Sequence, residues 1–144
     1  MKRYVMGFCF STDLKKVALV KKNRPKWQAG LWNGIGGHVE DEEEATAAMQ
    51  REFEEETGVA VEQQGPWRLV STIGNDHYQI EVFASATDAV WDATTITDEN
   101  IARWDVITLL ESTDETVYNV PWLMLMAREL LMGRDHSTHY RIQH

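Results

Sequence analysis

Short stretches rich in apolar residues, separated by turn-like polar segments, predict four β-strands. Residues 3–10 (RYVMGFCF) and 17–22 (VALVKK) are separated by the turn-like segment STDLKK, a pattern that predicts an opening hairpin. Residues 67–74 (WRLVSTIG) and 78–86 (YQIEVFASA) flank a second turn and predict another strand pair. The last stretch has a clear period of two, so that one face of its strand would carry Tyr78, Ile80, Val82 and Ala84.

A helical period of 3.6 residues begins in the second quarter of the chain. The helix is expected to begin at residue 42 or 43 and to end at Thr57. Asp41 is suited to cap its N-terminus, and Gly58 would end it in the left-handed conformation. Acidic residues in its first turn also suit the positive end of the helix dipole.

A second helix is predicted from Asn119 onwards. An Asn cap followed by Pro121 in the first turn is a typical helix start, and Gly133 would end the apolar segment WLMLMARELLM. The side chains expected in its core-facing stripe are Trp122, Leu123, Met126 and Leu130. Strands and helices therefore mix without regular βαβ alternation, which indicates an α+β or mixed-sheet domain.

Three further segments have less regular patterns. The polar residues 88–100 predict a loop, and ARWDVI (102–107) predicts a further strand. Residues 21–37 predict a loop with basic and aromatic side chains that leads into a short strand. The tail carries histidines without regular ligand spacing, so we expect a surface segment or an edge strand there and no second metal site: His136, His139 and His144.

The distribution of acids on the first helix points to chemistry. One stripe of this helix begins apolar and ends in carboxylates: Ala45, Ala48, Met49, Glu52, Glu55 and Glu56. The opposite side already supplies a solvated face: Glu44, Ala47, Gln50, Arg51, Glu54 and Thr57. The last three glutamates of the stripe are therefore predicted to face the core. The alternative is an ordinary run of charge on an exposed helix.

A partly buried trio of carboxylates needs a cation. Carboxylates about 6 Å apart repel one another by roughly 3 kcal/mol per pair at an effective dielectric constant near 20. Their hard oxygen atoms suit Mg²⁺ or Mn²⁺ better than zinc, whose usual ligands are histidine and cysteine. The helix therefore predicts a site for a divalent cation.

Composition narrows the class of protein. The chain has 144 residues and a formal net charge of −9, and residues 40–56 alone hold nine acids against Arg51. Acidity confined to one segment favours a local cation site and disfavours a nucleic acid duplex as partner, because duplex binding needs a basic face. We expect one domain over residues 1–144, present as a monomer or a homodimer.

The redox and targeting features are sparse. The single cysteine, Cys9, lies inside a predicted strand and is expected to be a buried structural thiol. It cannot form an internal disulfide, which fits a reducing cytoplasmic setting. No signal peptide or apolar run of membrane-spanning length is present in the sequence.

The spacing of the residues around the acidic helix resembles the box of the Nudix hydrolase (MutT-like) family. That box reads G, five residues, E, seven residues, R-E-apolar-x-E-E-x-G-apolar. Every specified position is filled here: Gly37, Glu43, Arg51, Glu52, Phe53, Glu55, Glu56, Gly58 and Val59. The resemblance implies the Nudix fold, an α/β/α sandwich in which a mixed β-sheet lies between helices.

The resemblance also implies an activity, which is metal-dependent hydrolysis of a pyrophosphate bond in a nucleoside diphosphate linked to a group X. Glu52 and Glu56 would be the best ligands of Mg²⁺, with Mn²⁺ as an alternative, and the Gly36 carbonyl would complete the coordination. Glu55 would be a further ligand or would orient water. In the family the positions of Glu43 and Arg51 form an ion pair that supports the site, with Gly37 and Gly58 as further structural positions.

Some resemblance extends beyond the box to family members that hydrolyse oxidised purine nucleoside triphosphates. In those enzymes a glutamate important to metal and water chemistry precedes a tryptophan by five residues, as Glu99 precedes Trp104 here. Glu99 is thus a candidate fourth carboxylate. The alternative is an ordinary loop acid.

The same enzymes suggest a nucleobase pocket. Those enzymes have a WNG-x-GG segment, and an aromatic residue lies six positions before its asparagine. In this chain the segment is Trp32–Gly37, its asparagine is Asn33, and Trp27 holds the aromatic position. Where they carry a pair of acids that reads the purine, this chain has Tyr118 and Asn119. An amide donates and accepts but lacks the charge of an acid, so discrimination of oxidised guanine would be poor. Asn119 could instead serve only as the helix cap, and Trp27 could serve only in loop packing.

The expected substrate is therefore a nucleoside triphosphate, either ordinary or oxidised, which would be cleaved to nucleoside monophosphate and pyrophosphate. Four basic residues of the loop could contact its phosphates or could simply be solvated: Lys21, Lys22, Arg24 and Lys26. Other substrates of the family remain alternatives, namely ADP-ribose, a dinucleoside polyphosphate or a capped RNA end. A module that senses nucleotides without hydrolysis is the alternative from another class.

Overall fold

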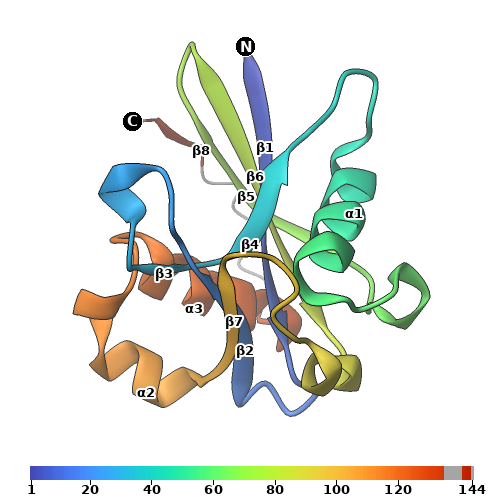
Figure 1. Cartoon of the computed structure of the whole chain (residues 1–144), viewed down its shortest axis with the longest axis vertical. Helices are drawn as coiled ribbons and strands as arrows, with labels where there is room; N and C mark the ends of the chain where they lie inside the picture. Colours follow the sequence, from blue (N-terminus) through green and yellow to red (C-terminus); the bar gives the residue numbers. More distant parts are fainter. Residues whose placement is uncertain (135–140, 144) are drawn as a thin grey trace.

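The computed structural model describes residues 1–134 and the backbone of residues 141–143. Its centre is a mixed sheet in the order β3-β2-β1-β6-β5-β8, with β4 paired to β1 and β7 paired to β2 (Figure 1). Strand β1 (Lys2–Phe10) is antiparallel to β2 (Lys16–Lys21) and parallel to β6 (Tyr78–Ala86). The predicted opening hairpin is therefore confirmed, and β1 joins it to the second strand pair.

The remaining strands complete the sheet. The second predicted pair is confirmed, since β5 (Arg68–Gly74) lies antiparallel to β6. The short strand predicted before the acidic helix occurs as β3 (Trp32–Asn33) and β4 (Ile35–His38). Strand β7 (Asn100–Asp105) is antiparallel to β2, and β8 (Arg141–Gln143) is parallel to β5.

The strand predicted at residues 102–107 was placed too far along the chain. Helix α2 (Val106–Glu111) begins directly after β7, because the Asp105 carboxylate accepts hydrogen bonds from the backbone N–H groups of Ile107 and Thr108. The predicted loop at residues 88–100 begins with a 3-10 helix, η3 (Asp88–Asp92). Strand β8 agrees with the edge strand expected in the tail, whereas the three tail histidines lie outside the described residues.

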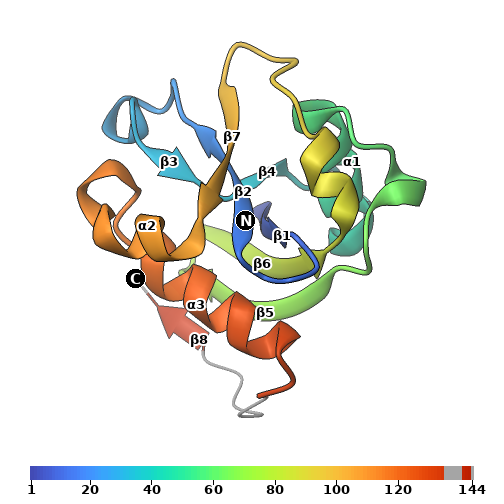
Figure 2. The same cartoon turned by 90° about the horizontal axis from the view of Figure 1, so that it is seen from below.

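Helices cover both faces of the sheet, which confirms the predicted fold class. Figure 2 shows α1 (Ala45–Thr57) on one side of β1, β6 and β5 and α3 (Val120–Leu131) on the other. Alternate residues of β6 supply the two cores, since Val82 faces α3 and Phe83 faces α1. The other elements are short 3-10 helices: η1 (Lys26–Gln28), η2 (Val61–Gln63) and η4 (Thr113–Glu115).

Helix α1 starts later than its sequence predicted. Its N-cap is Glu44, which forms no side-chain cap hydrogen bond, and Asp41 is not the cap. The reason is the turn before the helix, where Glu42 has a φ of 65° and the Glu43 carboxylate accepts from the Glu40 backbone N–H. The predicted end is confirmed, because Gly58 has a φ of 77° and its N–H donates to the Glu54 carbonyl.

The buried face of α1 is also rotated from the predicted stripe. Its buried residues are Ala48, Met49, Phe53 and Thr57. Thr57 was expected to be solvated but is buried, and its hydroxyl donates to the Phe53 carbonyl. Glu52 and Glu56 lie at the edge of this face and are half-buried, whereas Glu55 is exposed. Two carboxylates, not three, therefore border the core.

Helix α3 has the predicted boundaries but a different buried face. Proline lies in its first turn, and Gly133 follows its end with a φ of 76°. Asn119 occupies the N-cap position without a side-chain cap hydrogen bond, so the predicted capping role is not borne out. Its fully buried residues are Val120, Leu123, Met124 and Ala127. Of the predicted core side chains only Leu123 is among them, and Trp122, Met126 and Leu130 are half-buried.

Cys9 is buried, as expected, and burial raises the pKa of its thiol to about 12. The thiol is therefore uncharged at neutral pH and packs as a small apolar group. Within the described part of the chain, no helix has the length and apolar character of a membrane span.

Candidate active site

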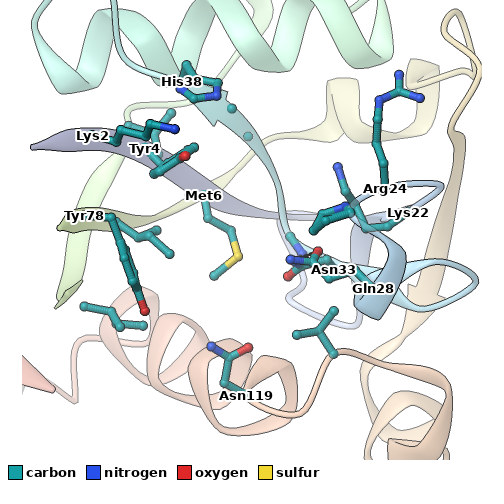
Figure 3. Close-up of a pocket in the computed structure, with 18 of the residues that line it drawn as sticks. Lys2, Tyr4, Met6, Lys22, Arg24, Gln28, Asn33, His38, Tyr78 and Asn119 are labelled. Carbon is teal, nitrogen blue, oxygen red and sulfur yellow. Dashed lines mark hydrogen bonds between the residues drawn. The ribbon is translucent and has the colours of Figure 1, made fainter. Parts of the chain in front are cut away.

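A cavity of about 970 Å³ opens between the sheet, the loop before β3 and the start of α3 (Figure 3). Its wall includes Gly36 and Gly37 of β4, so it reaches the beginning of the acidic segment. At the other side it is lined by the loop that carries Lys22 and Arg24 and by Asn119. The cavity thus extends from Gly37, the first position of the box, to the predicted base-binding residues. The glutamates of the box are not among the described residues that line it, and Glu52 lies behind Gly37.

Two glycines let the box approach the sheet. A Cβ atom at Gly37 would lie 2.5 Å from the carboxyl carbon of Glu52, and one at Gly36 would lie 1.9 Å from the Val5 carbonyl oxygen. The backbone contact excludes a side chain at Gly36, and a side chain at Gly37 would displace the Glu52 carboxylate from its position. The Glu52 carboxylate can therefore rest against the backbone of β4 at the edge of the cavity.

Arg51 holds the turn before α1 to the helix. Its Nε and Nη2 donate to the two Glu43 carboxylate oxygens, each at 2.9 Å, and Nη2 also donates to the His38 carbonyl at 3.0 Å. The hydrogen bonds from Arg51 lower the pKa of Glu43 to about 2. The predicted ion pair between these two residues is therefore present. Arg51 Nη1 additionally contacts Glu52 at 2.9 Å and Glu55 at 3.4 Å.

The pKa values of Glu52 and Glu56 are raised, whereas that of Glu43 is lowered. Glu52 and Glu56 lie one helical turn apart, and burial raises the pKa of each despite the hydrogen bonds from Arg51 to Glu52 and from Thr97 to Glu56. Neighbouring carboxylates raise both pKa values further. A positive charge placed between them would relieve this repulsion.

Glu99 lies near this pair although it is distant in sequence. Its backbone N–H donates to the Thr97 hydroxyl at 3.2 Å, and the same hydroxyl donates to Glu56 at 3.3 Å. Its charge is one of those that raise the pKa of Glu56. The structure thus brings Glu99, the candidate fourth carboxylate, to the acidic edge of α1.

The carboxylate of Glu99 is already bound by two donors. Only 5% of the residue is exposed, and it accepts from Lys22 Nζ at 3.0 Å and from the Asn23 backbone N–H at 2.6 Å. Burial raises the pKa of Glu99, but these two hydrogen bonds, together with the positive charges of Lys22 and Arg24, outweigh it and hold the pKa below its ordinary value. Lys22 therefore lines the cavity while paired with Glu99.

The predicted base-binding residues all line the cavity. Trp27 and Tyr118 stand at its mouth with 61% and 63% of their surfaces exposed. Asn33 points inward, where its Oδ1 accepts from the Gly34 N–H at 2.8 Å and its Nδ2 donates to Gln28 Oε1 at 3.2 Å. Asn119 Oδ1 is buried without a hydrogen-bond partner among the described residues.

Several side chains of this cavity were not expected from the sequence to belong to the site, among them Tyr4, Met6, Gln28, Tyr78 and Ile80. The period of two had placed Tyr78 and Ile80 on one face of their strand, and the pairing of Tyr4 with Ile80 extends that face to β1. No periodic signal marks Gln28, which ends the short 3-10 helix η1.

The oxygen ligands fit a magnesium site shared with a substrate. Within residues 1–134 and 141–143, no three acidic, histidine or cysteine side chains are gathered closely enough to chelate an ion by themselves. Mg²⁺ usually takes one or two carboxylates and completes its octahedron with water and phosphate oxygens. Glu52 and Glu56, half-buried and destabilised as anions, meet that requirement.

Known proteins share the sequence family and the fold of this chain. The family model described as NUDIX domain matches residues 1–123. The structure is similar to a MutT of Aliivibrio salmonicida or Vibrio cholerae, with a TM-score of 0.66 and 20% identity over 88% of this chain and 95% of that chain. A NUDIX family hydrolase of Clostridium perfringens gives a TM-score of 0.67 and 19% identity over 90% and 97% of the two chains.

A third relative is NrtR of Shewanella oneidensis. Its NUDIX domain, complexed with ADP ribose, gives a TM-score of 0.69 and 20% identity over 90% of this chain and 87% of that chain. In the NrtR structure with a 27mer DNA, 91% of this chain matches 62% of the longer chain. No curated protein matches. Because the family model spans most of the sequence and its box borders the cavity, the chain belongs to the NUDIX family.

Proposed function

We propose that this chain is a Mg²⁺-dependent pyrophosphatase that cleaves a nucleoside triphosphate to nucleoside monophosphate and pyrophosphate. Hydrolysis of a pyrophosphate bond with a divalent cation is the general chemistry of the family. One observation carries the finer proposal: a single cavity joins the glycines against Glu52 to an amide-lined end at Asn33 and Asn119. Phosphates and a base could therefore be held together.

The box residues would hold the cation and activate water. Glu52 and Glu56 are the proposed principal ligands, with Glu55, Glu99 and the Gly36 carbonyl as further oxygen ligands or water-orienting groups. When bound, Mg²⁺ polarises the phosphoryl oxygens and neutralises charge on the leaving phosphate. One of the glutamates accepts a proton from the attacking water, and the anhydride bond breaks without a covalent intermediate.

Positively charged side chains beside the box supply the remaining contacts. Arg51 orients Glu52 through its 2.9 Å hydrogen bond and would act in catalysis through that carboxylate. Lys22 and Arg24 line the cavity and would contact the phosphates. Trp27 and Tyr118 at the mouth, with Asn33 and Asn119 inside, form the proposed base site.

ADP-ribose is the second candidate substrate, since the similar NUDIX domain of Shewanella NrtR was complexed with ADP ribose. Dinucleoside polyphosphates and capped RNA ends are further family substrates. A module that binds nucleotides without hydrolysis, or that contacts nucleic acid as in the NrtR complex with DNA, is the alternative from another class. The complete box favours catalysis over this alternative.

A nucleotide screen with Mg²⁺ tests the proposal. Nucleoside triphosphates, ADP-ribose and dinucleoside polyphosphates are incubated with the protein, and both products are identified by chromatography. We expect nucleoside monophosphate and pyrophosphate from one or more triphosphates, and no turnover after exhaustive chelation. Turnover that survives chelation, or release of orthophosphate from triphosphates, would contradict the proposal. Binding without any product would favour the sensing module.

A further inference from the structure

Gln28 occupies a fixed position at the wall of the cavity. It ends the 3-10 helix η1, where its backbone N–H donates to the Pro25 carbonyl at 2.9 Å and its carbonyl accepts from the Leu31 N–H at 2.9 Å. Its half-buried side chain lines the cavity beside Asn33 (Figure 3). The position from which the side chain extends is therefore set by the loop itself.

A chain of hydrogen bonds fixes the orientation of the Gln28 amide. The Gly34 backbone N–H can only donate, so Asn33 must present Oδ1 to it. Asn33 Nδ2 is then the atom that faces Gln28, and Gln28 must present Oε1, as observed at 3.2 Å. The Gln28 amino group consequently points away from Asn33, and no hydrogen bond within the described residues uses it.

The remainder of the cavity offers the complementary group. Asn119 Oδ1 is a buried acceptor without a partner among the described residues. A buried polar atom left unpaired is unfavourable, and a ligand that pairs with it removes this penalty. Gln28, Asn33 and Asn119 all line this cavity, so the amide donors of Gln28 and Asn33 and the Asn119 side chain surround one space. The Asn119 Oδ1 atom itself is buried, and it reaches a ligand by rotation of its side chain.

We propose that Gln28 is a specificity-determining residue of this cavity. It donates an N–H to an acceptor on the edge of a nucleobase whose own amino group donates to Asn119. The ligand class is thus a nucleotide with an amino-bearing base, in preference to bases that lack the amino group. This inference rests on the proposal that the cavity holds a nucleotide, but it concerns binding and does not require hydrolysis.

Equilibrium binding without metal tests the inference separately from catalysis. Isothermal titration calorimetry in the presence of a chelator measures the affinity for two pairs of nucleotides, dGMP with dIMP and dCMP with dUMP. In each pair the first base carries an amino group that the second lacks. Ribose 5-phosphate, which lacks a base, reports on the phosphate contacts alone. We expect the wild-type protein to bind the amino-bearing member of one pair about tenfold more tightly, and either member more tightly than ribose 5-phosphate.

Two substitutions then separate the amino group of Gln28, which would donate to the ligand, from its Oε1 atom, which accepts from Asn33. Gln28→Glu keeps an oxygen that accepts from Asn33 but removes the amino group, and Gln28→Met removes both without adding charge. Both substitutions should lower the affinity for the nucleotide about tenfold, while the affinity for ribose 5-phosphate stays the same. The matched control is Gln63→Glu, an exposed glutamine that likewise ends a 3-10 helix, away from the cavity.

The outcomes discriminate the two proposals. Thermal unfolding first checks that both Gln28 variants are folded. If both then bind nucleotide and ribose 5-phosphate with the same affinity ratio as the wild type, the proposed role of Gln28 is overturned. A wild-type protein with equal affinity for ribose 5-phosphate and every nucleotide would also overturn it. Base-selective binding that depends on Gln28 without hydrolysis under any condition would support this inference and overturn the proposed enzyme activity alone.

Discussion

Two pairs of glutamates near the cavity differ in how their charge is balanced. Glu43 and Glu99 are each held by a cationic side chain and a backbone N–H, and the pKa of each is below its ordinary value. Glu52 and Glu56 are half-buried, and burial together with nearby carboxylates raises the pKa of each. The same residue type therefore serves two purposes within one site.

The contrast indicates which carboxylates stabilise the fold and which ones need an additional cation. Glu43 and Glu99 are compensated by the protein itself, so they hold the turn before α1 and the loop after β2 in place. Arg51 compensates part of the charge of Glu52. Among the described side chains Glu56 accepts a hydrogen bond only from the neutral Thr97 hydroxyl, and the nearby Lys22 charge does not outweigh the burial that raises its pKa. A divalent cation would balance the remaining negative charge of Glu52 and Glu56.

The largest effect should come from Glu56→Gln. The substitution keeps the shape of the side chain but removes its charge, so we expect the hydrolysis rate to fall roughly 10²-fold or more at saturating Mg²⁺. Thermal unfolding of the metal-free protein should be unchanged or shifted upwards, because repulsion from Glu52 and Glu99 is relieved. Turnover measurements and unfolding curves check the two expectations.

Glu62→Gln is the matched control, since Glu62 is exposed in the short helix η2 away from the cavity. It should leave the rate unchanged. A wild-type rate in Glu56→Gln would remove Glu56 from the metal site and with it the distinction between the two pairs.

Glu99→Gln should have the next largest effect. The amide oxygen can still accept from the Asn23 N–H, but the ion pair with Lys22 is lost. If Glu99 takes part in metal or water chemistry, kcat falls about tenfold with little change in KM. Steady-state kinetics over a range of Mg²⁺ concentrations make the measurement.

A rise in KM with unchanged kcat would instead assign Glu99 to the anchoring of Lys22 at the cavity wall. Lys22→Met would then show the same rise in KM. Wild-type kinetics in Glu99→Gln would make it an ordinary loop acid.

Glu43→Gln should affect stability more than chemistry. Its folded-state pKa of about 2 lies below the ordinary 4.5, so the ion pair with Arg51 stabilises the protein above about pH 4.5 and is lost as the pH falls towards 2. The variant should therefore melt a few degrees below wild type at pH 7. This difference should close between pH 4.5 and 2. A constant difference across that range would show that the charge of Glu43 is not what stabilises the turn.

Features that depend on local periodicity could be predicted from the sequence. The spacing within one helix places Glu52 and Glu56 one turn apart. The alternation along residues 78–86 likewise predicted β6. These predictions hold because the periods of 3.6 and 2 residues are properties of the helix and the strand themselves. The ion pair of Arg51 with Glu43 was implied by the family resemblance and is present.

Features set by tertiary contacts could not be derived in the same way. The positive φ of Glu42 moved the helix start, and burial of Thr57 rotated the core-facing stripe away from Glu55. Glu99 reaches Glu56 only because β7 pairs with β2 and Thr97 bridges the two. Gln28 has no periodic pattern around it, and its contact with Asn33 depends on the fold of the loop.

The smallest effect should come from Glu55→Gln. Glu55 was predicted to share the core-facing stripe, but 57% of its side chain is exposed and its only described ion pair is with Arg51 at 3.4 Å. Exposed ion pairs of this kind contribute little to stability. As a peripheral oxygen ligand or water-orienting group, Glu55 should lower kcat by about threefold when substituted, against roughly 10²-fold for Glu56. Parallel kinetics of the two variants at several Mg²⁺ concentrations make the comparison. Equal losses in both would show that the helix turns Glu55 towards the cation when substrate is present, so that three carboxylates, and not two, form the uncompensated group.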